Sequence, residues 1–389
     1  MKLTKTYYIV LLLISFFISC TEPYNLKSID FEDALIIEAI ITDEVKHQEI
    51  KLSRTFSLEE FKPSAESNAT VLITDNSQNV YEFEEIVDGN YTSKIAFGAE
   101  SNKEYTLSVT TENGKVYKSQ PTVLPSIVPI NNLYASREIS EETGNENMTV
   151  FVDGLDPSGN SKYFRYEYEE TYEIIAPAWT NKECTGDLSI PFNREACDEA
   201  HRRRQCFNTV ASDSIIQLRT DNLSQSKQSP AFPVRVISRN DAIIRTRYSI
   251  LVKQYIQSLE AFTFYEILSK FSSSDNLFSQ NQPGFFSGNL YAVDNKNEKV
   301  VGFFDVSSFS SKRIFFNFSD FFPAESLPSF FGDCTPFEID DDEVLQSRID
   351  AGEIVNYSHD PNKPFLWIEI QCWDCREIGT TIKPDFWID

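Results

Sequence analysis

Histidine is scarce in this chain of 389 residues, and the common local signatures of catalysis are missing. The three histidines, His47, His201 and His359, are too scattered for the ligand spacing of a metal site. No glycine-rich loop of the kind that cradles a nucleotide phosphate is present, and no Gly-x-Ser-x-Gly segment is present to display a nucleophilic serine. The sequence therefore gives no motif-based reason to expect a metalloenzyme, a nucleotide hydrolase or a serine hydrolase.

Positive charge and long apolar runs are also in short supply. The chain has 35 Lys and Arg against 59 Asp and Glu, a formal charge of −24, and such a field repels nucleic acid and anionic lipid headgroups. Beyond the first 20 residues no apolar stretch approaches the ~20 residues that a spanning helix needs. A hydrophobic content of 41% with 13% aromatic residues nevertheless predicts a folded chain with a sizeable core.

The one long apolar run lies at the start of the chain and ends at a cysteine. Lys2 and Lys5 precede apolar residues 7–18, and Ser19 is followed by Cys20. This is the layout of a secretory signal that ends at a lipid-acceptor cysteine. We expect residues 1–19 to be removed, Cys20 to carry acyl chains such as palmitate, and residues 20–33 to form a tether. An ordinary signal peptide with an incidental cysteine, or an uncleaved anchor, is the alternative.

Cysteine is absent between Cys20 and Cys184, so packing alone is expected to stabilise the N-terminal part. Six cysteines remain after lipidation, and an even number in an exported chain predicts disulfides. We predict a local bond between Cys184 and Cys197, and we expect two upstream cysteines each to bond one member of the terminal pair. A thiol redox site or part of a zinc site is the alternative for that terminal pair. The two upstream cysteines and the pair are Cys206 and Cys334, and Cys372 and Cys375.

Residues 34–125 have the pattern of a small β-sandwich domain. Polar and apolar residues alternate in short segments, as in 105–110, and turn residues such as Asn113-Gly114 separate the segments. Pro121, Pro125 and Pro129 mark a boundary, because proline lacks a ladder donor. The strands are predicted at 34–41, 49–54, 70–74, 80–86, 91–94, 105–110 and 116–119.

Residues 126–389 predict a larger β-rich domain that contains the six cysteines and one packed helix. Strands are expected at 162–175, 243–255, 300–306, 313–318 and 365–370. Ser258 can cap a helix whose apolar residues recur at helical spacing up to Ser272. The predicted fold class is therefore mainly β: an N-terminal immunoglobulin-like or transthyretin-like antiparallel sandwich, followed by a β-rich domain with one helix.

Two further groups of residues are candidate sites. The acidic run 340–343 has the charge to hold calcium, but it lacks the spaced ligands and central glycine of a calcium loop, which favours a solvated turn. Phenylalanines in loop-like context could form an exposed apolar site for a partner protein. These partner-site candidates are Phe321, Phe322, Phe330 and Phe331.

Several segments together resemble a known family over nearly the whole mature chain. The resemblance is to the Bacteroidota lipoproteins grouped as domain of unknown function 4249, and its most specific part is the C-terminal motif. In that family Cys206 matches a lone upstream cysteine, which makes Cys184 and Cys197 an extra pair here. The segments that carry the resemblance are 247–255, Phe264-Tyr265, 288–290, 301–304, 312–315, Cys372-Trp373-Asp374-Cys375-Arg376, Gly379 and 383–387.

The resemblance implies an outer-membrane lipoprotein often encoded beside a TonB-dependent transporter, with no established activity. Glu22 is the one acid close behind Cys20, which is no clear surface-export signal, so the family association alone favours the cell surface over the periplasmic face. We expect a non-enzymatic accessory or ligand-binding lipoprotein that needs no cofactor and works with an outer-membrane β-barrel protein, either such a transporter or an assembly complex. The alternative is an envelope enzyme: a thiol oxidoreductase at Cys372 and Cys375, or a hydrolase built from acids such as Glu167, Glu169, Glu170 and Glu173.

Overall fold

The computed structural model describes residues 33–56, 62–153, 161–179, 194–221, 231–272, 288–329, 334–357 and 366–388. The predicted leader, Cys20 and almost all of the tether lie outside these residues. The chain is mainly β, as the sequence predicts, and it combines a large mixed sheet with a few helices. In the described part of the chain no helix is long and apolar enough to cross a membrane.

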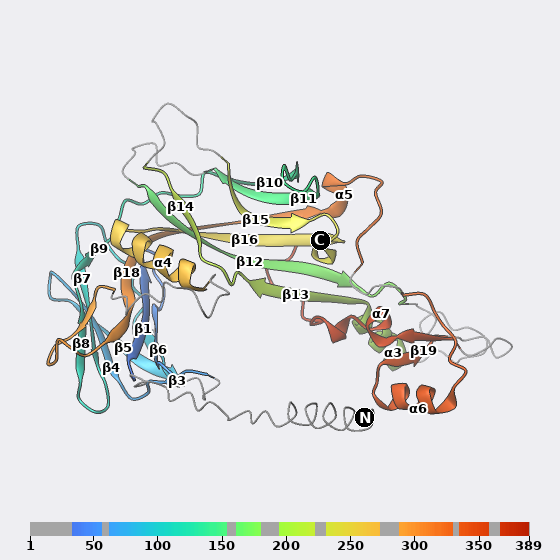
Figure 1. Ribbon diagram of the computed structural model, residues 1–389, viewed down its shortest axis with the longest axis horizontal. Coiled ribbons are helices and arrows are strands. Elements are labelled where there is room, and N and C mark those ends of the chain that lie inside the picture. Colours follow the sequence, from blue (N-terminus) through green and yellow to red (C-terminus); the bar gives the residue numbers. More distant parts are fainter. Residues whose placement is uncertain are drawn as a thin grey trace, which may run out of the picture.

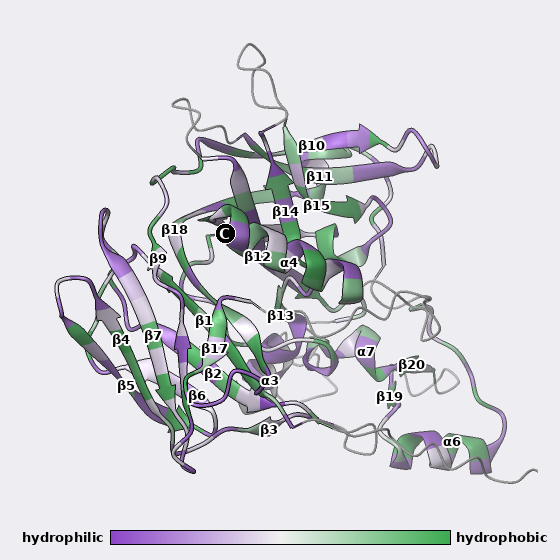
Figure 2. Ribbon diagram, turned by 60° about the vertical axis from the view of Figure 1, so that its left-hand side comes forward, coloured by the Kyte–Doolittle hydropathy of each residue, from purple (hydrophilic) through white to green (hydrophobic). Residues whose placement is uncertain are grey.

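The N-terminal strands fold into a sandwich, here called the first sandwich. Its residues alternate between the core and the surface, as in β7, where Tyr105, Leu107 and Val109 are fully buried and their neighbours are not. Figure 2 shows hydrophobic and hydrophilic residues mixed along these strands. The strands are β1 (Leu35–Thr42), β2 (Glu49–Arg54), β3 (Ser64–Ala65), β4 (Thr70–Asp75), β5 (Val80–Val87), β6 (Asn90–Ser93), β7 (Glu104–Thr110), β8 (Val116–Ser119) and β9 (Thr122–Val123).

Two strands from much later in the chain complete the first sandwich, which the sequence did not predict. The strand β17 (Leu290–Ala292) pairs with β8, and the start of β18 (Val300–Asn317) pairs in parallel with β1. Leu290, Val300 and Phe304 are buried in the same core as the N-terminal strands. The predicted sandwich domain 34–125 therefore obtains part of its core from residues 290–306.

Strand β18 runs through both halves of the molecule (Figure 1). Residues 300–307 pair with β1, and residues 308–317 pair antiparallel with β16 (Arg247–Ile256). The sequence suggested two separate strands, 300–306 and 313–318, where the structure has one of 18 residues. Gly302 adopts a φ of +130°, and a Cβ at this position would lie 2.0 Å from the Ile37 carbonyl oxygen of β1. The parallel pairing thus requires glycine at this point.

The second sandwich packs a three-stranded sheet against the sheet that contains β16 and the end of β18. Its core includes Val150, Tyr166, Tyr248 and Phe316. The predicted helix is confirmed as α4 (Leu259–Ser272), whose Ala261 amide donates to Ser258 Oγ at 3.1 Å. The other elements of this sandwich are β10 (Asn132–Ile139), β11 (Glu146–Asp153), β12 (Tyr163–Ile175), β13 (Gln205–Ala211), β14 (Ile216–Arg219), β15 (Phe232–Ser238), the 3-10 helix η1 (Ala242–Ile244) and α5 (Phe318–Phe321).

A third unit, here called the terminal module, lies beyond the ends of β12 and β13 (Figure 1). It contains short elements around a small core, to which Ile174 of β12 and Cys206 of β13 also contribute. Strands β19 and β20 form a separate two-stranded sheet, in register from Ile354 opposite Glu369. The elements are α3 (Arg194–Arg204), α6 (Asp342–Asp350), β19 (Ile354–Asn356), β20 (Trp367–Glu369), α7 (Ile370–Trp373) and the 3-10 helix η2 (Cys375–Glu377).

Candidate functional site

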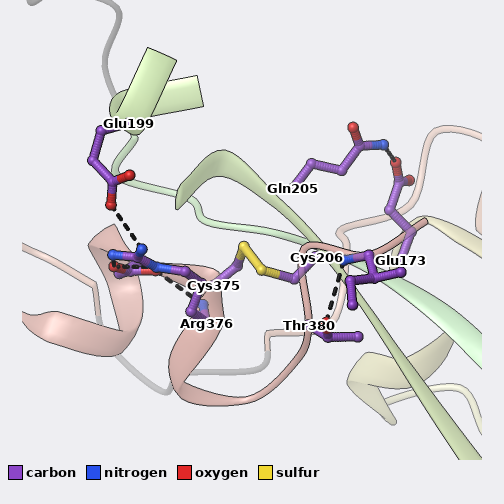
Figure 3. Close-up of a disulfide and its surroundings, with 9 residues drawn as sticks. Glu173, Glu199, Gln205, Cys206, Cys375, Arg376 and Thr380 are labelled. Atoms are coloured by element: carbon purple, nitrogen blue, oxygen red, sulfur yellow. Dashed lines mark hydrogen bonds and ion pairs between the residues drawn. A yellow bond between two sulfur atoms is a disulfide. The ribbon is translucent and has the colours of Figure 1, made fainter. Parts of the chain in front are cut away.

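The terminal pair of cysteines holds the terminal module to distant parts of the chain. One disulfide joins Cys206 to Cys375 across 169 residues (Figure 3). The other joins Cys334 to Cys372 across 38 residues. Each member of the pair thus bonds an upstream cysteine, in agreement with the pairing expected from the sequence. The predicted bond between Cys184 and Cys197 lies outside the described residues and side chains.

These bonds determine what chemistry the pair offers. Cys372 and Cys375 are not joined to each other, and both are 0% exposed. A redox-active cysteine is partly accessible and has thiolate character, and a zinc ligand is a thiolate. Neither cysteine provides such a group here. In the described residues no cluster of three His, Cys, Asp or Glu side chains is placed to hold a metal ion.

An ion-pair network closes the surface beside the Cys206–Cys375 bond. Asp374 accepts from the Arg376 backbone amide at 3.0 Å and from its Nη2 at 2.6 Å, and Arg376 Nη1 donates to Glu199 of α3 at 2.7 Å (Figure 3). Hydrogen bonding to Asp374, together with the charges of both acids, raises the pKa of Arg376 above its ordinary value. The network therefore fastens α3 onto η2.

The acids proposed for a hydrolase do not converge, because each has its own partner. Glu170 is buried and accepts from Arg235 Nε and Nη2, both at 2.9 Å, and from the Tyr248 hydroxyl at 2.6 Å. Burial, followed by the charge of Glu170, raises the pKa of Tyr248 well above its ordinary value. The other three acids are bonded to different groups: Glu167 to Arg165 and Tyr255, Glu169 to Lys253, and Glu173 to Gln205.

The acidic run 340–343 forms the start of a helix. Asp341 is the N-cap of α6, and its Oδ1 accepts from the amides of Glu343 at 2.9 Å and Val344 at 3.1 Å. An acid at this position satisfies amides that have no partner within the helix. The run therefore has a structural role that its sequence did not reveal.

The phenylalanine site predicted for a partner protein is wrong at Phe322. This side chain is 1% exposed, and Phe321 is half-buried. Phe318 begins α5 and Phe322 is its C-cap, so both turn toward the core, with their ring centroids 4.9 Å apart. Arg137 lies over the ring of Phe322, 4.8 Å from its centroid. Phe330 and Phe331 lie outside the described residues.

A buried polar cluster lies where β18 passes from the first sandwich to the second. The guanidinium of Arg165 lies 4.3 Å from the ring centroid of Tyr255 and 4.9 Å from that of Tyr265 in α4. Asp305 of β18 is fully buried, and its Oδ2 accepts from Gln257 Nε2 at 2.8 Å and from a serine hydroxyl at 2.9 Å. Burial raises the pKa of Asp305 above its ordinary value.

Several atoms of this cluster have no hydrogen-bond partner among the described residues. They are Nε and Nη2 of Arg165, Oδ1 of Asp305 and Oε1 of Gln257. Leaving such atoms unpaired in the interior costs free energy. Because β12, β16, β18 and α4 all meet here, the cluster fixes the junction between the two sandwiches rather than presenting groups to solvent.

Another candidate site is a pocket of about 590 Å³ at the end of the second sandwich, here called the tail pocket. It forms where β12 ends, β16 begins and β18 ends, and Trp387 of the C-terminal segment adds to its lining. Its size is within the range of small-molecule sites, roughly 300 to 1,000 Å³. The residues that line it are Glu173, Arg245, Thr246, Arg247, Asn317, Phe318, Ser319, Leu327 and Trp387.

Sequence reasoning did not identify the tail pocket. Its lining residues come from four separate parts of the chain, and no local pattern connects Glu173 with Arg247 or with Trp387. The one available signal is the tryptophan at the very end of the chain, two residues before Asp389. A large aromatic residue at that position indicates a tail that packs against the fold.

Comparisons with known proteins give the family of the chain. No curated protein matches it. Among solved structures it is similar to a DUF4785 family protein from Legionella pneumophila, at 10% identity and a TM-score of 0.19, over 57% of this chain and 52% of that one. The chain thus spans about half of that protein, a likeness too weak to carry any argument. Residues 21–313 match a family model, and the chain belongs to the family described as Domain of unknown function (DUF4249).

Proposed function

We propose that this protein is a non-enzymatic accessory or ligand-binding lipoprotein of the outer membrane, anchored through Cys20. It acts beside an outer-membrane β-barrel protein, either a TonB-dependent transporter or an assembly complex. In this arrangement the first sandwich lies next to the tether, and the second sandwich and the terminal module extend toward the partner.

The use of the cysteines is the observation that carries this proposal. Both members of the terminal pair form buried disulfides with upstream cysteines, Cys375 with Cys206 and Cys372 with Cys334. Such bonds persist in oxidising compartments outside the cytoplasm, which is where the leader sequence would direct the chain. The separate pairing of the four acids of β12 adds support, because a hydrolase would need two of them to face one substrate.

Cross-linking in intact cells followed by affinity purification tests the partner. The wild-type protein is expected to bring down a β-barrel protein, and the Cys20→Ala variant, which keeps every described contact, is expected to lose it and to leave the membrane fraction. Recovery of no β-barrel from the wild type would contradict the proposal. Retention of Cys20→Ala in the detergent phase would contradict the lipid anchor.

Two measurements complete the test. Protease digestion of intact cells is expected to degrade the protein if it lies on the cell surface, whereas protection until the outer membrane is opened would place it on the periplasmic face. An insulin-reduction assay is expected to show no activity. Reduction that disappears in Cys372→Ser would establish the thiol oxidoreductase instead.

A further inference from the structure

The C-terminal segment forms an ordered wall of the tail pocket. The Trp387 amide donates to the Pro384 carbonyl at 2.9 Å, which closes a turn. The Trp387 ring lies edge-on to Phe207 and Phe315, with centroids 5.0 and 5.8 Å away, and the side chain is 6% exposed. Figure 1 marks the C-terminus beside β16. Contacts with the rest of the fold therefore hold this wall in place.

The two arginines of the pocket differ from most others in the structure. Arg235, Arg239 and Arg376, for example, each bind a carboxylate. In contrast, Arg245 donates to the Pro328 carbonyl, and Arg247 donates to the Ile388 carbonyl and to Asn317 Oδ1 at 3.2 Å. Among the described residues neither Arg245 nor Arg247 contacts an acid. Since a guanidinium has five N–H donors, each retains donors for another group.

The one acid among the residues that line the pocket, Glu173, is engaged elsewhere. Tyr172 pairs with Tyr248 across β12 and β16, so the next residue of β12, Glu173, lies near Arg247 at the mouth of the pocket. Its carboxylate accepts from Gln205 Nε2 at 2.5 Å instead. Among the residues that line the pocket, two guanidiniums and one carboxylate give a net formal charge of +1, within a chain whose formal charge is −24.

The remaining feature of the pocket is an apolar wall, which includes the mostly buried side chain of Trp387. Trp387 Nε1 is buried and has no hydrogen-bond partner among the described residues. Phe318 and Leu327 line the same pocket, and Leu327 is 50% exposed although it is a large aliphatic residue. A ligand that covers Leu327 would remove this apolar surface from water.

We propose that the tail pocket binds a small organic carboxylate with an apolar body. The carboxylate accepts from Arg245 and Arg247, whose planar guanidiniums match its two oxygens, and the body packs on Leu327 and Trp387. The single positive charge favours a monoanion over a phosphate monoester, which carries about −1.5 to −2 at pH 7. This site goes beyond the function proposed above, because it requires neither a transporter partner nor a lipid anchor.

Fluorine NMR of the full chain labelled with 5-fluorotryptophan provides the test. The four tryptophans are Trp179, Trp367, Trp373 and Trp387, and the Trp387→Phe variant identifies the resonance of interest. Phenylacetate is expected to shift that resonance with saturation while the other three stay in place. Phenylacetamide, a neutral molecule of the same shape, is expected to bind at least tenfold more weakly. Equal binding of the two, or no shift with phenylacetate, would overturn the proposal.

Two variants distinguish phenylacetate binding at the tail pocket from non-specific binding elsewhere on the protein. Leu327→Glu places a negative charge in the pocket without removing a core residue, and it is expected to weaken phenylacetate binding by tenfold or more. The matched control is Leu259→Glu, at a residue of similar exposure, 45%, on α4, which is expected to bind as the wild type does. Unchanged binding in Leu327→Glu, or an equal loss in both variants, would contradict the site. Tighter binding of phenyl phosphate than of phenylacetate would overturn the carboxylate assignment.

Discussion

The first sandwich and the terminal module are stabilised by different interactions. The described core of the first sandwich contains no cysteine and buries aliphatic and aromatic side chains from two sheets, among them Leu35, Ile73 and Tyr105. In the terminal module three of the seven buried core residues are cysteines. A unit of short helices and strands buries too little apolar surface to hold itself together, so cross-links replace packing. Of these two units, the one with the smaller hydrophobic core contains the described disulfides.

The largest effect is expected from removing the long-range disulfide. The double variant Cys206→Ala, Cys375→Ala frees a loop of 169 residues and should lower the free energy of unfolding of the terminal module by about 3 to 5 kcal/mol. Hydrogen exchange should show loss of protection in α7 and η2, while β4 and β7 of the first sandwich keep theirs. Equal loss in both regions would mean that the two units are not stabilised independently.

A somewhat smaller effect is expected at Gly302 in the first sandwich. Gly302→Ala would place a Cβ 2.0 Å from the Ile37 carbonyl oxygen and should destabilise the sandwich by about 2 to 3 kcal/mol in urea unfolding. Gly114→Ala is the matched control, because Gly114 lies in the same sandwich and also has a positive φ, of 83°, but open space around it. If both variants lose the same stability, the close approach of β1 and β18 contributes nothing beyond backbone strain.

A substitution at Asp75 tests how much one buried polar group contributes to the stability of the first sandwich, which is otherwise stabilised by packing. Its Oδ1 accepts from the amides of Ser77 and Asn79, both at 2.9 Å, and Oδ2 accepts from Asn79 Nδ2 at 2.7 Å and pairs with Lys103. Burial alone would raise its pKa, but these hydrogen bonds outweigh burial and lower the pKa to about 2. Asp75→Asn should cost about 2 kcal/mol at pH 7.

The pH dependence of the Asp75→Asn variant follows from the lowered pKa. The carboxylate of the folded protein stabilises it above the ordinary pKa of 3.8, and this contribution is lost as the pH falls through about 2. The difference in stability between wild type and variant should therefore be full at pH 7 and shrink between about pH 4 and pH 2. A difference that is constant over this range would show that the charge of Asp75 is not what matters.

The smallest effect is expected from an exposed ion pair of the first sandwich. Lys115 Nζ lies 2.9 Å from Glu298 Oε1, and the lysine side chain is 49% exposed. Lys115→Met should change the free energy of unfolding by about 0.5 kcal/mol or less, because water screens such pairs. A larger loss in thermal unfolding would show that surface charge, and not only packing, attaches segment 290–306 to the sandwich.

Local features of the fold were predictable from the sequence, and long-range ones were not. The alternation in 105–110 and the cap at Ser258 predict β7 and α4 because each pattern acts over a few residues. Strand β18 was missed because the polar run around Ser310 and Ser311 reads as a break between two strands. Its backbone is paired there by β16, a partner the local pattern does not reveal.

Among the candidate sites, too, some features could be predicted from the sequence and others depend on long-range contacts. The expected bonds of Cys372 and Cys375 to upstream cysteines are confirmed, but six cysteines allow many pairings, so the sequence does not determine which cysteine bonds which. The tail pocket joins Arg245 and Arg247 to Trp387, about 140 residues away, and only the folded chain brings them together. Phe322 was misjudged because its loop-like sequence context hides the single helical turn that buries it.

Because β18 belongs to both sandwiches, the first sandwich cannot complete its fold as soon as its own strands have been synthesised. The first sandwich is encoded first, yet its core stays incomplete until residues 290–306 have been synthesised. At about 5 to 20 residues per second, the 187 residues from Ser119 to Val306 take roughly 10 to 40 s. During that interval the edges of β1 and β8 have no partner strand, and they would pair readily with other chains. A nascent chain of this fold therefore needs protection from aggregation until residues 290–306 have been synthesised.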